Sequence, residues 1–119
     1  FVDGAALAGA MNREGLPGVI FTAACFTPYA SKHKGEPCEG VLLHVSDAHA
    51  FRPVRTGVTL LYRIREMWPR QVRWKPRDGE LAGCGAFEDE PPAPEALLAA
   101  WEADSAAFAR RKAAYHLYK

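Results

Sequence analysis

Two short stretches of the sequence bring a potential nucleophile close to a potential base. Ser31 is followed by Lys32, and Cys38 lies between His33 and His44. Serine–lysine catalysis uses an S-x-x-K spacing, and an activated serine can also sit on a strained strand-to-helix turn, but neither pattern is present here. A cysteine nucleophile needs surroundings that stabilise its thiolate, and the sequence does not indicate them around Cys38. We therefore predict no catalytic residue in this chain.

Metal and cofactor chemistry is not indicated by the spacing of the residues that would support it. The histidines lack H-x-x-x-H spacing, the cysteines form no C-x-x-C pair, and the glycines form no G-x-G-x-x-G or Walker motif. We expect no metal site, no cofactor and free thiols, with a Cys38–Cys84 disulfide as the alternative. The residues concerned are His33, His44, His49, His116, Cys25, Cys38, Cys84, Gly35, Gly40 and Gly57.

The bulk properties are those of one ordinary globular domain. The formal net charge is +1 and the sequence pI is about 7.9, so there is no general attraction for nucleic acid or an anionic membrane. No apolar run reaches the roughly 18 residues that a membrane span needs. The sequence begins at Phe1 without a charged and then apolar leader. We interpret residues 1–119 as a single domain excised from a longer protein.

The first half of the sequence predicts a helix and two strands. Asp3 can cap a helix over residues 4–14. Residues 19–26 are apolar at both odd and even positions, which is typical of a strand that is buried on both sides. Residues 27–40 are rich in proline, glycine and charges and predict a long loop, and residues 41–46 alternate as a second strand.

The second half predicts two further helices and one more strand. Pro53 suits the first turn of a helix over residues 53–67. Residues 71–74 alternate as a half-exposed third strand, which implies a right-handed parallel crossover. Residues 76–94 read as irregular chain with one short turn, and residues 94–112 as a helix. One buried stripe on that helix is expected to consist of Leu97, Trp101, Phe108 and Tyr115.

These elements predict a mixed α/β (α+β) fold with the order α-β-β-α-β-α. The sheet would have three strands or slightly more, and about three helices would pack on it.

Several ordered motifs resemble one known family. They are similar to the C-terminal part of the NamZ-type exo-β-N-acetylmuramidase family, long catalogued as a domain of unknown function. The similarity covers residues 1–75 and 95–118. The motifs are Leu16-Pro17-Gly18-Val19, Phe26-Thr27-Pro28, the stretch from Ser31 to Cys38, Gly40-Val41, His44-Val45-Ser46-Asp47, the stretch from Phe51 to Gly57, and Trp101-Glu102 through Phe108 to Tyr115-His116-Leu117-Tyr118.

The resemblance implies a bacterial parent enzyme with two domains. Its Rossmann-like N-terminal domain would carry the catalytic acids, and the smaller C-terminal accessory domain, formed by this sequence, would close the cleft that holds a glycan end. Such enzymes remove terminal N-acetylmuramic acid from peptidoglycan fragments. The implied partners are the N-terminal domain of the same chain and a muropeptide or glycan end, and this chain alone is expected to be inactive.

Glycoside hydrolysis usually needs two carboxyl groups about 5–10 Å apart. The sequence offers Glu36, Glu39, Asp47 and the cluster Glu88-Asp89-Glu90. We expect the cluster to be a solvated loop. Glu36, in the long loop, is expected to contact a sugar hydroxyl rather than to catalyse.

Muramic acid differs from glucosamine by a lactyl carboxylate, so an exo-acting muramidase should bind an anion. Arg52 and Arg55 flank a predicted helix start, and an arginine fork suits a carboxylate. The alternative is that one of them pairs with Asp47 and braces the chain. We expect residues 27–40 and 47–56 to line the glycan end together. The predicted substrate-binding set is Tyr29, Ser31, Lys32, Glu36, His44, Arg52 and Arg55.

Two other functions stay open. A non-catalytic protein-interaction or dimerisation module would present an apolar patch, not polar loops, as its contact surface. A free-standing small hydrolase would need a convergent nucleophile–base pair, and the sequence contains no recognisable one.

Overall fold

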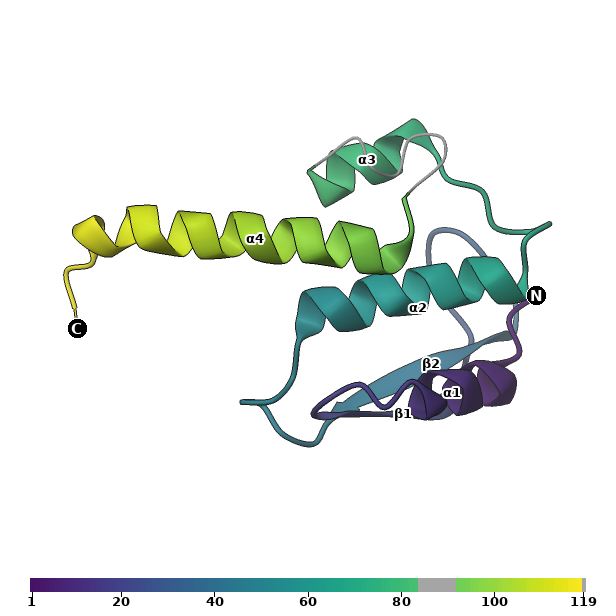
Figure 1. Cartoon of the computed structure of the whole chain (residues 1–119). Helices are drawn as coiled ribbons and strands as arrows, with labels where there is room; N and C mark the ends of the chain where they lie inside the picture. Colours follow the sequence, from purple (N-terminus) through teal and green to yellow (C-terminus); the bar gives the residue numbers. More distant parts are fainter. Residues whose placement is uncertain (84–91, 119) are drawn as a thin grey trace. The chain divides into compact units, whose positions relative to one another are not determined.

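The structure is a computed structural model, and it describes residues 1–83 and 92–118. The chain divides into two compact units, Phe1–Arg73 and a second that begins at Trp74. The first unit contains both strands and two helices, and the described part of the second is helical (Figure 1). The predicted mixed α/β class is confirmed.

Helix α1 (Gly4–Arg13) begins where the sequence predicts. The Asp3 carboxylate accepts a hydrogen bond of 2.9 Å from the Ala6 N–H, which satisfies one of the donors left free at a helix start. Gly15 follows the helix with φ 64°, a left-handed conformation that glycine adopts without a Cβ penalty. The buried face of α1 consists of Gly4, Leu7, Ala8 and Met11.

Strands β1 (Val19–Phe26) and β2 (Cys38–Val45) pair as an antiparallel hairpin. The register places Val19 opposite Val45 and Phe26 opposite Cys38. Odd-numbered side chains of both strands therefore share one face, and even-numbered side chains share the other. Strand β2 begins at Cys38 rather than at the predicted residue 41, so the loop between the strands spans residues 27–37.

The odd-numbered face of the hairpin carries the core of the first unit. Phe21 from β1 packs with Leu7 and Met11 from α1, and all three side chains are almost fully buried. Helix α2 (Pro53–Met67) adds one apolar stripe to this cluster through Leu60, Ile64 and Met67. Full burial of each large apolar side chain stabilises the fold by about 1.5–3 kcal/mol, so this cluster is the main source of stability in the unit.

The even-numbered face of the hairpin is open. Ile20 is 52% exposed, and Phe26 and Leu42 are each 54% exposed. Burial of β1 on both sides, which its apolar pattern predicts, is therefore wrong for this chain. Both unit 1 helices pack on the opposite face, and within the described residues the hairpin has no second covering layer.

The predicted third strand over residues 71–74 is also absent. The N–H groups of Gln71 and Val72 both donate to the Trp68 carbonyl, each at 3.1 Å, and close a turn after α2. This turn uses a backbone donor that a strand would need for its ladder. The described sheet accordingly has two strands, and the predicted parallel crossover is not formed.

In the second unit, residues 76–82 form a helix where the sequence analysis expected irregular chain with one short turn. Helix α3 (Pro76–Ala82) begins at a capping box in which the Asp78 carboxylate accepts from the Lys75 N–H at 2.8 Å. Helix α4 (Pro94–Lys112) has the predicted bounds, and the 3₁₀ turn Ala113–Tyr115 follows it.

The predicted stripe on α4 is buried only at its N-terminal end. Leu97 is buried and Trp101 is half-buried. Phe108 is 55% exposed, and Tyr115, beyond the helix, is 83% exposed. The periodic pattern identifies the helix and its apolar side, but the described residues do not cover the C-terminal half of that side.

Two glycines permit close contacts in the first unit. A Cβ at Gly4 would lie 2.5 Å from the carbonyl oxygen of Gly40, so α1 can approach β2 only with glycine there. Gly18 has φ 69°, and a Cβ there would overlap the Asp47 carbonyl and lie 2.7 Å from the Phe51 nitrogen. The Gly18 carbonyl also accepts a 2.9 Å hydrogen bond from Ser46. These contacts hold the chain after β2 against the start of β1.

The outer edge of β1 is held by a side chain rather than by a strand. The Asn12 amide of α1 donates to the Phe21 carbonyl at 2.8 Å and accepts from the Phe21 N–H at 2.9 Å. These two bonds reproduce what a neighbouring strand would offer at that residue.

We expect Gly18→Ala to destabilise the chain more than Gly15→Ala. Both glycines have positive φ, which costs an L-residue about 1–2 kcal/mol, but only Gly18 also has backbone in the way of a Cβ. Because of this added overlap, Gly18→Ala should lower the free energy of unfolding by about 2–4 kcal/mol. Urea denaturation of the two variants measures the difference. Equal losses would show that the contact with residues 47–51 contributes nothing.

We expect Asn12→Ala to lower the free energy of unfolding by about 1–3 kcal/mol, because it leaves the half-buried Phe21 N–H and carbonyl without partners. Asn12→Asp keeps an acceptor for the N–H but places a carboxylate oxygen against the carbonyl, so it should restore only part of the loss. Denaturation together with amide exchange at Phe21 tests this. Wild-type exchange at Phe21 in Asn12→Ala would contradict it.

Candidate functional site

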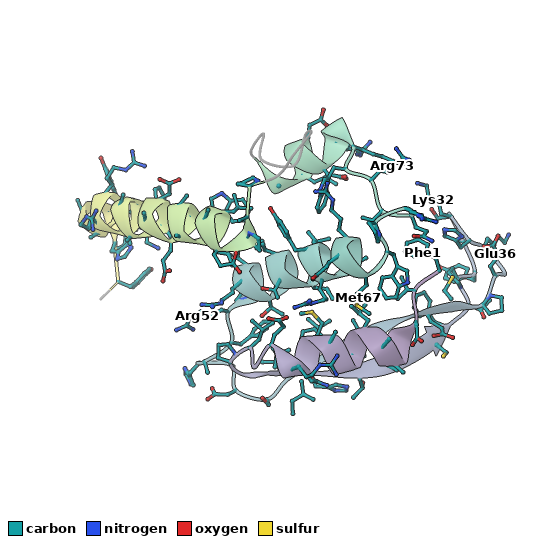
Figure 2. All side chains as sticks on the ribbon, turned by 45° about the vertical axis from the view of Figure 1, so that its right-hand side comes forward. Phe1, Lys32, Glu36, Arg52, Met67 and Arg73 are labelled. Carbon is teal, nitrogen blue, oxygen red and sulfur yellow. The ribbon has the colours of Figure 1, made fainter. Side chains whose placement is uncertain are left out.

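The predicted substrate-binding residues lie at the two ends of the hairpin. Loop 27–37 joins the end of β1 to the start of β2, and residues 46–52 leave the end of β2. The strands are antiparallel and each has eight residues, so the two segments are separated by a strand length of about 25 Å. Figure 2 shows Lys32 and Glu36 at one end, near Phe1, and Arg52 at the other.

This arrangement separates the predicted substrate-binding residues into two groups. Lys32 lies in loop 27–37 with its predicted companions Tyr29, Ser31 and Glu36, whereas Arg52 and Arg55 are at the opposite end. The expectation that residues 27–40 and 47–56 line one glycan end together is therefore not met on this unit. The physical reason is the hairpin itself, because the antiparallel pairing sends the two segments in opposite directions.

Loop 27–37 is held in a defined conformation by its own hydrogen bonds. The Gly35 N–H donates to the Pro28 carbonyl at 2.8 Å, and the Glu36 N–H donates to the His33 carbonyl at 3.0 Å. The His33 ring nitrogen Nδ1 lies 2.8 Å from Glu36 Oε2. Glu36, predicted to contact a sugar, is thus already bonded within the loop.

Two residues of this loop adopt a conformation that side chains with a Cβ disfavour. Ser31 has φ 64° and His33 has φ 59°. Non-glycine residues in the left-handed region cost free energy, and such residues concentrate at functional sites. Between them Lys32 is exposed and has no ion pair in the described part of the chain, and Tyr29 is 91% exposed. The loop therefore presents an aromatic ring and a positive charge to solvent.

Arg52 has a structural role at the other end. Its Nη1 donates to the His49 carbonyl at 2.9 Å and lies 3.3 Å from the Ala50 carbonyl oxygen. The Asp47 carboxylate accepts from the N–H groups of His49 and Ala50. The proposed Arg–Asp47 pair is not formed among the described residues. Arg52 does brace this segment, but through backbone carbonyls.

Arg55 lies in the first turn of α2 and is exposed. It forms no ion pair with any residue that the structure describes. Arg55 lies at the end of the hairpin opposite to Lys32, because α2 follows the end of β2.

His44 belongs to neither segment. It lies on the open face of the hairpin, where its Nε2 is 2.8 Å from the Thr22 hydroxyl oxygen. The exposed side chains Ile20 and Leu42 share this face. The apolar residues at even positions of β1 predicted a buried surface here, and the structure leaves it exposed.

Every carboxylate of the first unit is occupied by a local bond. Glu14 and Glu66 pair with Arg63, and the Glu39 carboxylate accepts from the Gly4 N–H at 3.0 Å. Asp3, Glu36 and Asp47 are bonded as described above, which accounts for all six acidic residues of this unit. Glu14 and Glu66 are brought to the same side chain, and both are paired with the Arg63 guanidinium between them.

The described residues contain no group of three or more histidine, cysteine or acidic side chains that could hold a metal ion. Cys25 and Cys38 are free thiols. Cys84, with the predicted acidic cluster at residues 88–90, lies outside the described residues. Among the described helices, none is both long and apolar enough to cross a membrane.

Comparison with known proteins agrees with the motifs. Residues 1–118 match the family model described as exo-β-N-acetylmuramidase NamZ, C-terminal. The peptidoglycan β-N-acetylmuramidase NamZ of Bacillus subtilis (strain 168) is 38% identical over 88 residues, which are 74% of this chain and 20% of that protein.

A solved structure of a DUF1343 family protein from Bacteroides fragilis superposes with a TM-score of 0.56 and 29% sequence identity, over 58% of this chain and 18% of the other. The chain thus spans about a fifth of the length of each relative. The match over residues 1–118, together with these relatives, places the chain in the family of the C-terminal domain of the exo-β-N-acetylmuramidase NamZ.

Proposed function

We propose that this chain is the accessory domain of a longer, exo-acting glycoside hydrolase that removes terminal N-acetylmuramic acid from peptidoglycan fragments. The catalytic carboxylates would belong to a Rossmann-like domain that precedes it in the same polypeptide. The similarity to the peptidoglycan β-N-acetylmuramidase of Bacillus subtilis, 20% of which this chain matches, supports the reaction class.

The observation that carries the non-catalytic role is the state of the acidic residues. All six carboxylates of the first unit have a bonding partner on the domain itself. A retaining or inverting glycosidase needs one carboxyl group to protonate the leaving oxygen and a second to attack the sugar or activate water. Each carboxylate of this unit has a structural partner on the domain itself, which supports placing the chemistry on the preceding domain.

Loop 27–37 is our candidate for contact with the glycan. It lies at the same end of the unit as Phe1 (Figure 2), and the Phe1 ring packs on Trp68 with the centroids 6.2 Å apart. A domain joined to Phe1 would therefore reach this end of the hairpin first. The distant Arg52 and Arg55 are less well placed for the same ligand.

The loop offers two contacts that fit a muramic acid residue. Lys32 can pair with the lactyl carboxylate as a point charge, and the exposed Tyr29 ring can stack on a sugar face, as amphipathic aromatic rings do at binding surfaces. The bonded loop, with Ser31 and His33 already in strained conformations, would present both side chains without further ordering of its backbone on binding.

A second candidate function is a protein-interaction or dimerisation module. The observation that favours it is the open face of the hairpin, where Ile20, Phe26 and Leu42 are exposed. An apolar surface of this kind usually marks a contact with another protein surface. It fits an interface with the preceding domain equally well, so it does not compete with the accessory role.

We expect the isolated 119-residue chain to release no N-acetylmuramic acid from muropeptides, and the longer polypeptide to release it. Product release measured by chromatography tests this, with circular dichroism to verify that the isolated chain is folded. Turnover by the isolated chain at a rate comparable with the longer polypeptide would disprove the accessory role.

In the longer polypeptide we expect Lys32→Ala to raise KM about tenfold, the effect of losing roughly 1.4 kcal/mol of binding, with little change in kcat. Tyr29→Ala should raise KM similarly. The matched control is Arg55→Ala, an exposed basic residue at the opposite end of the hairpin, which should leave KM unchanged.

A substrate analogue without the lactyl carboxylate separates the two contacts, because it should abolish the Lys32→Ala effect and preserve that of Tyr29→Ala. If Arg55→Ala raises KM while the two loop variants behave as wild type, the ligand contacts the other end of the unit.

A further inference from the structure

The two outer edges of the hairpin differ in how they are protected. The free edge of β1 is covered at Phe21 by the Asn12 side chain. Strand β2 pairs with β1 only, and within the described residues no side chain bonds to the backbone groups on its other edge. In the part of the chain that the structure describes, the β2 edge therefore lacks even the partial cover that Asn12 gives to β1 at Phe21.

The register identifies the backbone groups that face outward from β2. In an antiparallel pair, opposite residues either exchange both backbone bonds or turn both groups away. Phe21 turns its N–H and carbonyl toward Asn12, so its partner Leu43 turns its own groups away from β1. By the same alternation, the backbone N–H and carbonyl groups of Val41 and Val45 also point away from β1.

The side chains along this edge are apolar on both faces. Leu42 is 54% exposed, Leu43 is 38% exposed and Val45 is 50% exposed. Natural proteins protect free edges with lysine, proline, bulges or covering elements, because an open edge pairs readily with another strand. The stretch from Val41 to Val45 contains no lysine and no proline, and β2 pairs with β1 in unbroken register, without a bulge.

We infer that the β2 edge is a docking site for a β-strand from the preceding domain of the same polypeptide. This addition would give the sheet a third strand, in place of residues 71–74, which do not form one. The inference rests on the proposed function only in requiring that longer polypeptide, and it is independent of the reaction catalysed.

Two observations favour this occupant over a second copy of the chain. The chain matches only 20% and 18% of the length of its relatives, so most of each relative is available to cover this edge. The N-terminal segment also lies beside β2, because the Gly4 N–H bonds to Glu39 and Gly4 contacts Gly40. A strand that ends just before Phe1 would arrive at the start of β2 and run antiparallel to it.

Amide hydrogen exchange tests the inference on the 119-residue chain and on the longer polypeptide. In the isolated chain the amides of Val41, Leu43 and Val45 should exchange rapidly. In the longer polypeptide the same amides should slow by about 100-fold or more, because strand pairing protects them. The internal control is the amides of Leu42 and His44, which bond to β1 and should be protected in both proteins.

A pair of substitutions checks that the protection comes from backbone pairing at this edge. Leu43→Pro removes an outward N–H that makes no bond in the hairpin, so it should leave the melting temperature of the isolated chain nearly unchanged and abolish edge protection in the longer polypeptide. Leu43→Lys is the second variant, should the proline prevent folding, and it should reduce the same protection. Leu42→Pro, the matched control, should destabilise both proteins because it breaks the β1 ladder.

Rapid exchange of Val41, Leu43 and Val45 in the longer polypeptide would overturn the inference, whether or not that polypeptide is active. Protection already present in the isolated chain, together with a dimer in sedimentation, would assign the edge to a second copy and would also overturn it. Loss of hydrolysis with edge protection intact would instead count against the proposed function alone.

Discussion

The first unit depends on the close packing of helix α1 across one face of the β1–β2 hairpin. Leu7 and Met11 bury Phe21, the Asn12 amide holds the Phe21 backbone, and Gly4 lets the helix start directly over Gly40. An isolated two-stranded hairpin is marginal in water, so the strands need this helix. Their position in turn determines where the two polar segments and the free edge lie.

The antiparallel hairpin gives its two ends different roles. At one end the side chains of Arg52 and Asp47 bond to the backbone of residues 47–51. The backbone of Asp47 and Phe51 also lies close to Gly18, where a Cβ would not fit. At the other end loop 27–37 bonds to itself and leaves Tyr29 and Lys32 in solvent. One end therefore stabilises the fold, and the other has side chains available for a ligand.

Membership of the NamZ C-terminal family gives the exposed surfaces of the hairpin a common explanation. The open face of the sheet and the β2 edge both carry exposed apolar side chains. Apolar surface of this kind is typical of interfaces within larger proteins.

The sequence by itself determined the local elements of this protein. Asp3, Gly15 and Pro53 mark helix ends through cap geometry that depends on only a few neighbouring residues. A continuous apolar run identifies β1, and alternating apolar residues identify most of β2. Only the tertiary structure decided that residues 71–74 close a turn after α2, that Arg52 bonds to carbonyl groups, and that Lys32 and Arg55 lie at opposite ends. These outcomes depend on which segments meet in space, and hydrophobic periodicity reports which side of an element is apolar without reporting what covers it.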